Sequence, residues 1–117
     1  SVYNYAVGCQ GSGDLLNHNA NRSSDYQALG GSGYVGENIY GSSGRGGATP
    51  DAAMALWMSE ASSYDYASGN IGSAGHYTQV VWRDTRQVGC AMARGAGNDF
   101  LVCRYWPAGN WIGERPF

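Results

Sequence analysis

The sequence predicts a small α+β domain. Three observations lead to this fold class: a well-delimited helix signal over residues 50–62, two β-prone segments around a turn at residues 94–98, and an extended segment at residues 37–40. At 117 residues the chain has room for one hydrophobic core. We therefore expect a single domain that combines a helix with a small antiparallel sheet.

Residues 50–62 carry the clearest helix signal in the chain. Thr49 is suited to the N-cap and Pro50 to the first helical position. A stripe at spacing i, i+3, i+4 and i+7 is formed by Ala53, Leu56, Trp57 and Glu60. This spacing places the four side chains on one helix face, which we expect to be buried. The stripe is unusual because it ends in a carboxylate, Glu60.

Two apolar segments, residues 86–93 and 99–106, flank the turn-like residues 94–98 and predict a β-hairpin. Each arm carries one cysteine, Cys90 and Cys103. A disulfide across such a hairpin is geometrically reasonable, and it would indicate an oxidising compartment. The alternative is a pair of reduced, buried thiols.

The remaining segments have weaker signals. Residues 1–10 fit the end of a helix, and residues 11–36 are rich in Gly, Ser and Asn, which favours loop with a helical turn around 14–17. The stretch "HYTQVVW", residues 76–82, favours β structure by propensity, and a short helix is also compatible. Residues 107–117 are expected to form an irregular tail.

Composition narrows the classes of partner. The seven basic residues are all arginine and are scattered, the net charge is −2, and charged residues make up 14% of the chain. Nucleic-acid binding needs a basic stripe, so we expect no such partner. No apolar run approaches membrane-spanning length, and residues 1–6 do not resemble a signal peptide. The 19 glycines and many aromatic residues instead indicate loops around a compact core.

Both histidines and two of the three glutamates lie where the local pattern predicts partial burial. These residues are His18, Glu37, Glu60 and His76. Carboxylates are rarely buried alone, so we expect mutual Glu–His hydrogen bonds or a divalent metal held through neutral imidazoles. The pattern alone is a weak signal, because the chain has neither HExxH nor two His at helical spacing. A structural role for each residue is the alternative.

Several motifs together resemble the CAP superfamily, which includes cysteine-rich secretory proteins, antigen 5 proteins and plant pathogenesis-related class 1 proteins. The motifs are "GENIY" (36–40), "ALWMSEASSYDY" (55–66), "GHYTQVVW" (75–82), "VGCAMA" (88–93), "LVCRY" (101–105) and "PAGNWIGERPF" (107–117). The resemblance implies one CAP domain over residues 1–117, folded as an α-β-α sandwich around a small antiparallel sheet. It also implies that the family's long first helix is truncated here to the segment "SVYNYAVGC".

The resemblance places the family's cavity tetrad on His18, Glu37, Glu60 and His76. His18 lies farther from Cys9 than the family's Cys-x-x-x-His spacing. It is assigned to the tetrad because it is the only other histidine in the chain. A divalent cation such as Zn²⁺ is implied at His18 and His76, although the fold does not require one. Cys9 is expected to lack its family partner, because Gly95 stands at the corresponding position.

Three further residues are expected around this cavity. Asn38 is expected to hydrogen-bond the backbone near it, and Thr78 and Gln79 are expected to support it from outside. The function implied by the resemblance is a secreted, non-catalytic binding protein, with an apolar surface for sterol or other lipid, acting in defence or virulence.

Two other functions are compatible with the same residues. One is a protease-like hydrolase that uses the tetrad for metal-assisted or general acid–base chemistry. Candidate nucleophiles would be Ser59, Ser63 and Ser73, but no GxSxG elbow is present. The other is a tetrad that only holds helix to sheet. We expect binding rather than catalysis, because fold resemblance does not by itself establish an activity.

Overall fold

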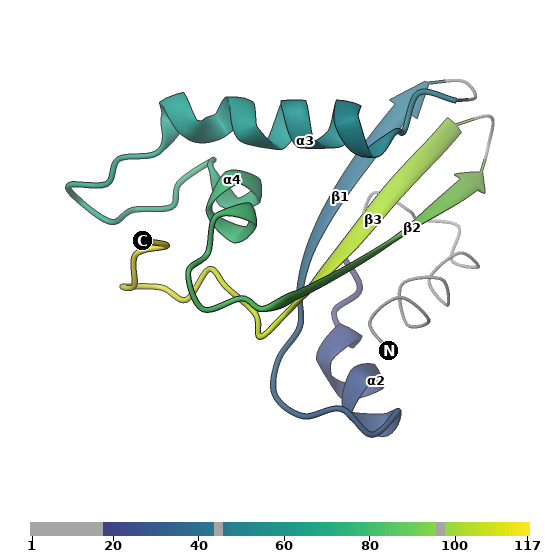
Figure 1. Cartoon of the computed structure of the whole chain (residues 1–117), viewed down its shortest axis with the longest axis horizontal. Helices are drawn as coiled ribbons and strands as arrows, with labels where there is room; N and C mark the ends of the chain where they lie inside the picture. Colours follow the sequence, from purple (N-terminus) through teal and green to yellow (C-terminus); the bar gives the residue numbers. More distant parts are fainter. Residues whose placement is uncertain (1–17, 44–45, 96–97) are drawn as a thin grey trace.

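The computed structural model describes residues 18–43, 46–95 and 98–117 (Figure 1). The elements in chain order are α2 (Arg22–Ala28), β1 (Gly36–Ser43), α3 (Pro50–Ser59), the 3-10 helix η2 (Glu60–Ser63), α4 (Gly75–Val80), β2 (Gln87–Gly95) and β3 (Asn98–Trp106). The predicted α+β class is confirmed. The expectations for residues 1–10, for a turn at 14–17 and for Cys9 lie outside the described residues.

The sheet has three antiparallel strands in the order β1-β3-β2. The β3 strand is central because β2 pairs with it through the predicted hairpin and β1 pairs along its other edge. In this register Glu37 lies opposite Arg104, and Cys103 lies between Asn38 and Cys90. The predicted hairpin and the predicted extended segment at 37–40 are both confirmed.

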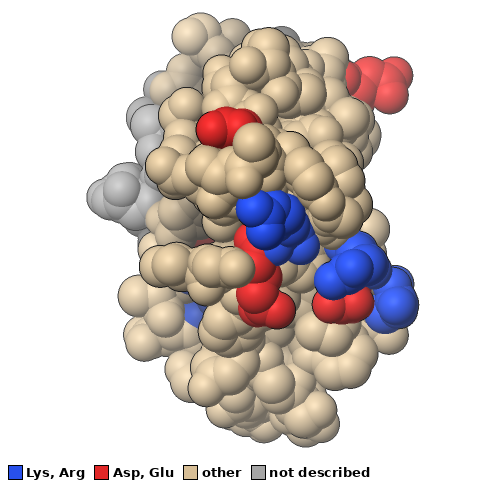
Figure 2. Space-filling model, turned by 90° about the vertical axis from the view of Figure 1, so that its left-hand side faces the viewer, with Lys and Arg blue, Asp and Glu red and all other residues tan. Residues whose placement is uncertain are grey.

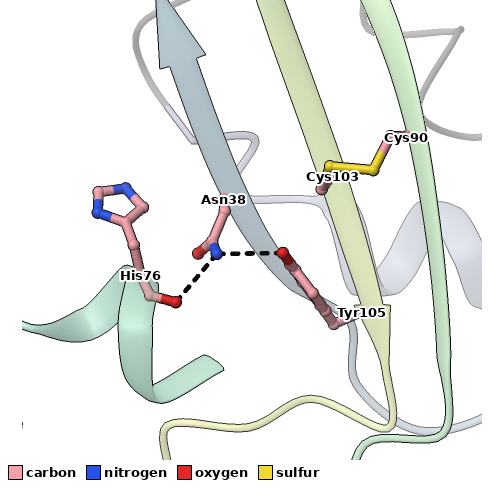
Figure 3. The surroundings of a disulfide bond; sticks show 5 residues. All are labelled: Asn38, His76, Cys90, Cys103 and Tyr105. Carbon is pink, nitrogen blue, oxygen red and sulfur yellow. Dashed lines mark hydrogen bonds between the residues drawn. A yellow bond between two sulfur atoms is a disulfide. The ribbon is translucent and has the colours of Figure 1, made fainter. Parts of the chain in front are cut away.

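The hydrophobic core lies between one face of the sheet and α3. Its buried members are Ala48, Ala53, Trp57, Leu101, Cys103 and Tyr105. The predicted disulfide between Cys90 and Cys103 is present and lies in this layer (Figure 3). On the other face α2 approaches the end of β3, where the rings of Tyr26 and Trp106 lie 6.5 Å apart. Helices therefore flank the sheet on both sides.

The helix α3 begins as predicted, because the Thr49 hydroxyl accepts a hydrogen bond from the Ala52 N–H at 3.2 Å. Ala53 and Trp57 are buried, but Leu56 is 54% exposed, so its predicted burial is wrong. Leu56 is displaced by about 100° around the helix from Trp57. A single helix packed on a small sheet buries only a narrow stripe of its surface. In α3 this stripe contains Ala53 and Trp57.

Two segments differ from the expectation based on propensity. Residues Gly75–Val80 form the helix α4 instead of a strand, and Arg22–Ala28 form the helix α2 inside a stretch expected to be mostly loop. The helix α2 has no buried residue, so its sequence lacks the apolar periodicity that would predict it. Within the described ranges, no helix is long and apolar enough to cross a membrane.

Candidate functional site

The side chain of Glu60 joins the end of α3 to the start of α4. Its Oε1 accepts hydrogen bonds from the backbone N–H groups of His76 at 3.0 Å and Tyr77 at 3.1 Å. Its Oε2 accepts a third from His76 Nδ1 at 2.8 Å. The first N–H groups of a helix have no partner inside the helix, and a carboxylate is favoured there. The Glu60 carboxylate therefore both stabilises the start of α4 and orients the His76 ring.

His76 is also held from the sheet. The Asn38 side-chain amide donates one hydrogen bond to the His76 carbonyl at 3.1 Å and one to the Tyr105 hydroxyl at 3.2 Å (Figure 3). Burial raises the pKa of Tyr105 to about 12, so its hydroxyl stays protonated at neutral pH. The buried Trp57 ring stacks on the imidazole, with centroids 6.0 Å apart and planes 8° from parallel.

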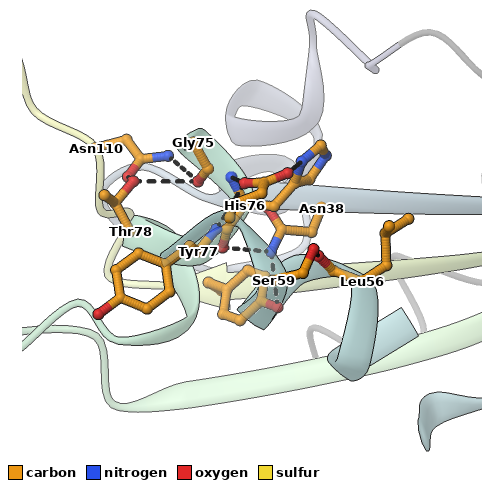
Figure 4. A network of polar contacts seen from close by, with 10 residues as sticks. Asn38, Leu56, Ser59, Gly75, His76, Tyr77, Thr78 and Asn110 are labelled. Carbon is orange, nitrogen blue, oxygen red and sulfur yellow. Dashed lines mark hydrogen bonds and ion pairs between the residues drawn. The ribbon is translucent and has the colours of Figure 1, made fainter. Parts of the chain in front are cut away.

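A third contact to α4 comes from the C-terminal segment. The Asn110 amide donates to the Gly75 carbonyl at 2.8 Å and accepts from the Thr78 hydroxyl at 2.6 Å (Figure 4). Gln79 likewise accepts from the Gly109 N–H at 2.9 Å. Thr78 and Gln79 are buried, and these hydrogen bonds join both side chains to the tail. Their supporting role around the cavity stays a prediction. Gly75 and Thr78, on either side of His76, are therefore held by Asn110, which lies 35 positions after Gly75 in the chain.

The second His–Glu pair lies at the start of β1. His18 Nδ1 lies 2.7 Å from Glu37 Oε1, which also accepts from the Asn19 N–H at 3.2 Å. The other oxygen, Oε2, forms an ion pair with Arg104 Nε. The Glu37 side chain is 1% exposed and the Arg104 side chain 0%, whereas the His18 side chain is 52% exposed. The imidazole therefore sits at the surface above a buried ion pair.

Arg104 is the member of this site that the sequence analysis missed. It lies directly opposite Glu37 in the pairing of β1 with β3. Side chains opposite each other in an antiparallel ladder share a face and interact. A signal was available in principle, because pairing "GEN" with "CRY" in this register brings the two charges together, but the register is known only from the fold.

The environment of Glu37 predicts a pH-dependent stability. Burial raises the pKa of Glu37, but the hydrogen bond from His18 and the charge of Arg104 lower it more, so the net pKa lies below its ordinary 4.5. A carboxyl with a lowered folded-state pKa stabilises the fold above its unfolded pKa. That stability is lost as the pH falls toward the folded pKa. We expect the free energy of unfolding to decrease as the pH drops below about 4.5.

Urea unfolding measured from neutral to strongly acidic pH checks this expectation. The variant Glu37→Gln has no carboxyl at this position, so its stability should fall less steeply below the ordinary Glu pKa than that of the wild type. Parallel curves for the two proteins would show that Glu37 does not carry the acid dependence.

The structure brings the four predicted residues together as two pairs, His18 with Glu37 and His76 with Glu60. Within residues 18–43, 46–95 and 98–117, no group of three or more His, Cys, Asp or Glu is placed to hold a metal ion. Each carboxylate accepts the Nδ1 proton of its histidine, which directs the lone pair of a neutral ring to Nε2. Each pair therefore offers one imidazole Nε2 as a donor to a metal ion, and neutral imidazole suits zinc.

Comparisons with known proteins agree with this fold. Pathogenesis-related leaf protein 4 of Solanum lycopersicum is 47% identical over 87 residues, which cover 71% of this chain and 54% of that protein. The chain thus spans about half the length of the curated relative it matches.

Two solved structures superpose over 99% of the chain. Venom allergen-like protein 4 of Schistosoma mansoni has a TM-score of 0.75 at 23% identity, with 68% of that chain covered. NaASP2, solved with Zn²⁺, has a TM-score of 0.70 at 26% identity, with 62% covered. A family model described as "CAP: Cysteine-rich secretory protein family" matches residues 2–105. The chain therefore belongs to the CAP family of cysteine-rich secretory proteins.

Proposed function

We propose that this chain is a secreted binding module of defence, and that a divalent cation binds to it through the Nε2 atoms of His18 and His76. The observation that carries the proposal is the shared arrangement of the two pairs. In both pairs a carboxylate holds Nδ1 and the imidazole remains partly exposed, at 52% for His18 and 36% for His76. A carboxylate on the far nitrogen fixes the ring and raises its basicity as a metal ligand.

The comparisons support this proposal by analogy. NaASP2 was solved with Zn²⁺, and a relative that is 47% identical over 87 residues is a pathogenesis-related leaf protein. The Cys90–Cys103 disulfide fits an oxidising, extracellular environment. A cation held by only two imidazoles completes its coordination with water or with a partner's groups, so we expect micromolar affinity at best.

The surface supports lipid as a second class of ligand. Figure 2 shows a face on which acidic and basic side chains form a few small groups within a largely uncharged surface. Apolar side chains are exposed in the tail, where Ile112 is 99% and Trp111 45% exposed. The ring of Tyr34, which lies before β1, packs edge-on against Trp111. We propose this apolar surface as the place for a sterol or other lipid.

The hydrolase alternative has less support. The Ser59 hydroxyl donates to the Leu56 carbonyl within its own helix. In the described part of the chain, no serine or threonine hydroxyl hydrogen-bonds to either imidazole. A nucleophile needs a base within hydrogen-bond reach, so binding is the function that this geometry favours.

A zinc titration by calorimetry near pH 7.5 tests the cation proposal. We expect the wild type to bind one Zn²⁺, and we expect His18→Ala and His76→Ala each to abolish binding. Glu60→Gln keeps an acceptor for the α4 backbone but removes the charge on the far side of His76, so its affinity should fall by about 10–100-fold.

Asp51→Asn is the matched control. This variant also replaces a carboxylate by an amide, but in the first turn of α3, at the opposite end of that helix from Glu60. It should leave the affinity for Zn²⁺ unchanged. Absence of binding in folded wild type would overturn the proposal. Binding that only one histidine variant abolishes would show that the two pairs do not share a cation.

A further inference from the structure

One sequence motif lies outside the two His–Glu pairs. Asn21-Arg22-Ser23 has the form Asn-X-Ser with X other than proline, which is the acceptor signal for N-linked glycosylation. The chain contains eight asparagines, and Asn21 is the only one followed two residues later by serine or threonine. The motif is short and occurs by chance, so its structural setting decides whether it can be used.

The fold leaves the Asn21 side chain free of other duties. Asn21 is exposed and occupies the N-cap position of α2, yet its side chain makes no capping hydrogen bond. Its backbone N–H donates to Asn19 Oδ1 at 2.9 Å, and its carbonyl accepts from the Asp25 N–H at 2.8 Å. The start of α2 is therefore held by the main chain and by the Asn19 side chain, and substitution on Asn21 Nδ2 breaks no contact of the described residues.

The surroundings of Asn21 are also open. No residue of α2 is buried, and the neighbours Ala20, Ser24 and Asp25 are exposed. A large hydrophilic group at this point would therefore project into solvent without displacing a packed side chain. The open setting is what a surface glycan requires.

We propose that Asn21 is an acceptor for an N-linked oligosaccharide. In the transfer, the bond from the sugar C1 to the diphosphate of a lipid-linked oligosaccharide donor breaks. A C1–N bond to Asn21 Nδ2 forms, one amide proton leaves, and the lipid diphosphate is the leaving group. The inference rests on the proposed secretion, because this donor is met only in the secretory pathway.

The position has a consequence for the His18 pair. Asn21 is three residues from His18, and the intervening Asn19 donates its backbone N–H to Glu37. An oligosaccharide on Asn21 would stand beside the exposed His18 ring. It would limit the size of what approaches this pair.

The contacts of the motif differ between its first and third residues. The Ser23 hydroxyl accepts a hydrogen bond from the Val35 N–H at 3.0 Å, so Ser23→Ala would disturb the fold as well as the motif. Asn21→Gln removes the acceptor and no described side-chain contact. Ser23→Thr keeps both the hydroxyl and the motif. Asn70→Gln is the matched control, because it makes the same change at another exposed asparagine that lies outside the motif.

The test is expression of the full chain behind a cleavable secretion signal in eukaryotic cells, followed by intact-mass measurement of protein from the medium and from the membrane fraction. We expect the wild type, Asn70→Gln and Ser23→Thr to carry the mass of an oligosaccharide. Peptide-N-glycosidase should remove this mass and convert Asn21 to aspartate. Asn21→Gln should have the unmodified mass.

The outcomes separate this inference from the proposed secretion. Unmodified wild type in the medium overturns the glycosylation and leaves secretion standing. Glycosylated protein retained in the membrane fraction supports Asn21 as the acceptor and counts against secretion. An oligosaccharide that persists in Asn21→Gln places the modification elsewhere and also overturns the inference.

Discussion

Replacing Arg104 with methionine is expected to lower the free energy of unfolding by about 3–5 kcal/mol. The substitution keeps a long side chain in a position that is 0% exposed, but it leaves the Glu37 carboxylate buried without its cation. Removing one partner of a buried ion pair is costly because the remaining charge stays desolvated. The pKa of Glu37 should rise for the same reason. Chemical denaturation at neutral pH measures the loss.

Two further variants test the cause of this loss. Arg83→Met makes the same change at a side chain that is 68% exposed and 3.9 Å from Asp84, so it should alter stability by less than about 0.5 kcal/mol. The double variant Arg104→Met with Glu37→Gln removes both charges and should recover part of the loss. If Arg104→Met is as stable as Arg83→Met, the buried pair does not contribute as described.

Replacing Trp57 with alanine is expected to cost about 3–5 kcal/mol, because it removes a large, fully packed side chain from the core. Trp57 is 2% exposed and connects the core to the His76 ring that stacks on it. The loss should therefore appear both in thermal unfolding and in the mobility of the His76 ring, which nuclear magnetic resonance of the imidazole can follow.

Leu56→Ala is the matched control for this prediction. Leu56 precedes Trp57 in the same helix and belongs to the same apolar stripe of the sequence, but it is 54% exposed. Its replacement should change stability by less than about 1 kcal/mol. Equal losses in the two variants would mean that α3 packs through a different face.

The elements that the sequence predicted well are those whose signals are local. Thr49 and Pro50 mark the start of α3 by their own conformational preferences, and the hairpin follows from two β-prone arms around a turn. The pairing of Cys90 with Cys103 followed from that hairpin. None of these features depends on a distant part of the chain.

The sequence left the segment of α4 open between a strand, which propensity favours, and a short helix, because the stability of this helix comes from other segments. Its six residues include β-prone Tyr, Thr and Val, which by propensity favour a strand. The Glu60 carboxylate accepts its first N–H groups, and Asn38 and Asn110 bind carbonyls near its start. Contacts from α3, β1 and the tail together outweigh a weak local preference.

The sequence by itself determined the α+β class, the start of α3 at Pro50, and the hairpin that carries Cys90 and Cys103, whereas the predicted helix over residues 50–62 ends at Ser59 and continues as the 3-10 helix η2. Only the tertiary structure decided that the four predicted His and Glu residues form two pairs, that Arg104 lies beneath one pair, and that Asn110 supports the helix carrying His76. The physical reason is the distance along the sequence over which each signal acts: caps, turns and periodicity depend on residues only a few positions apart. The contact between Glu37 and Arg104 depends on strand register, which the fold sets across the whole chain.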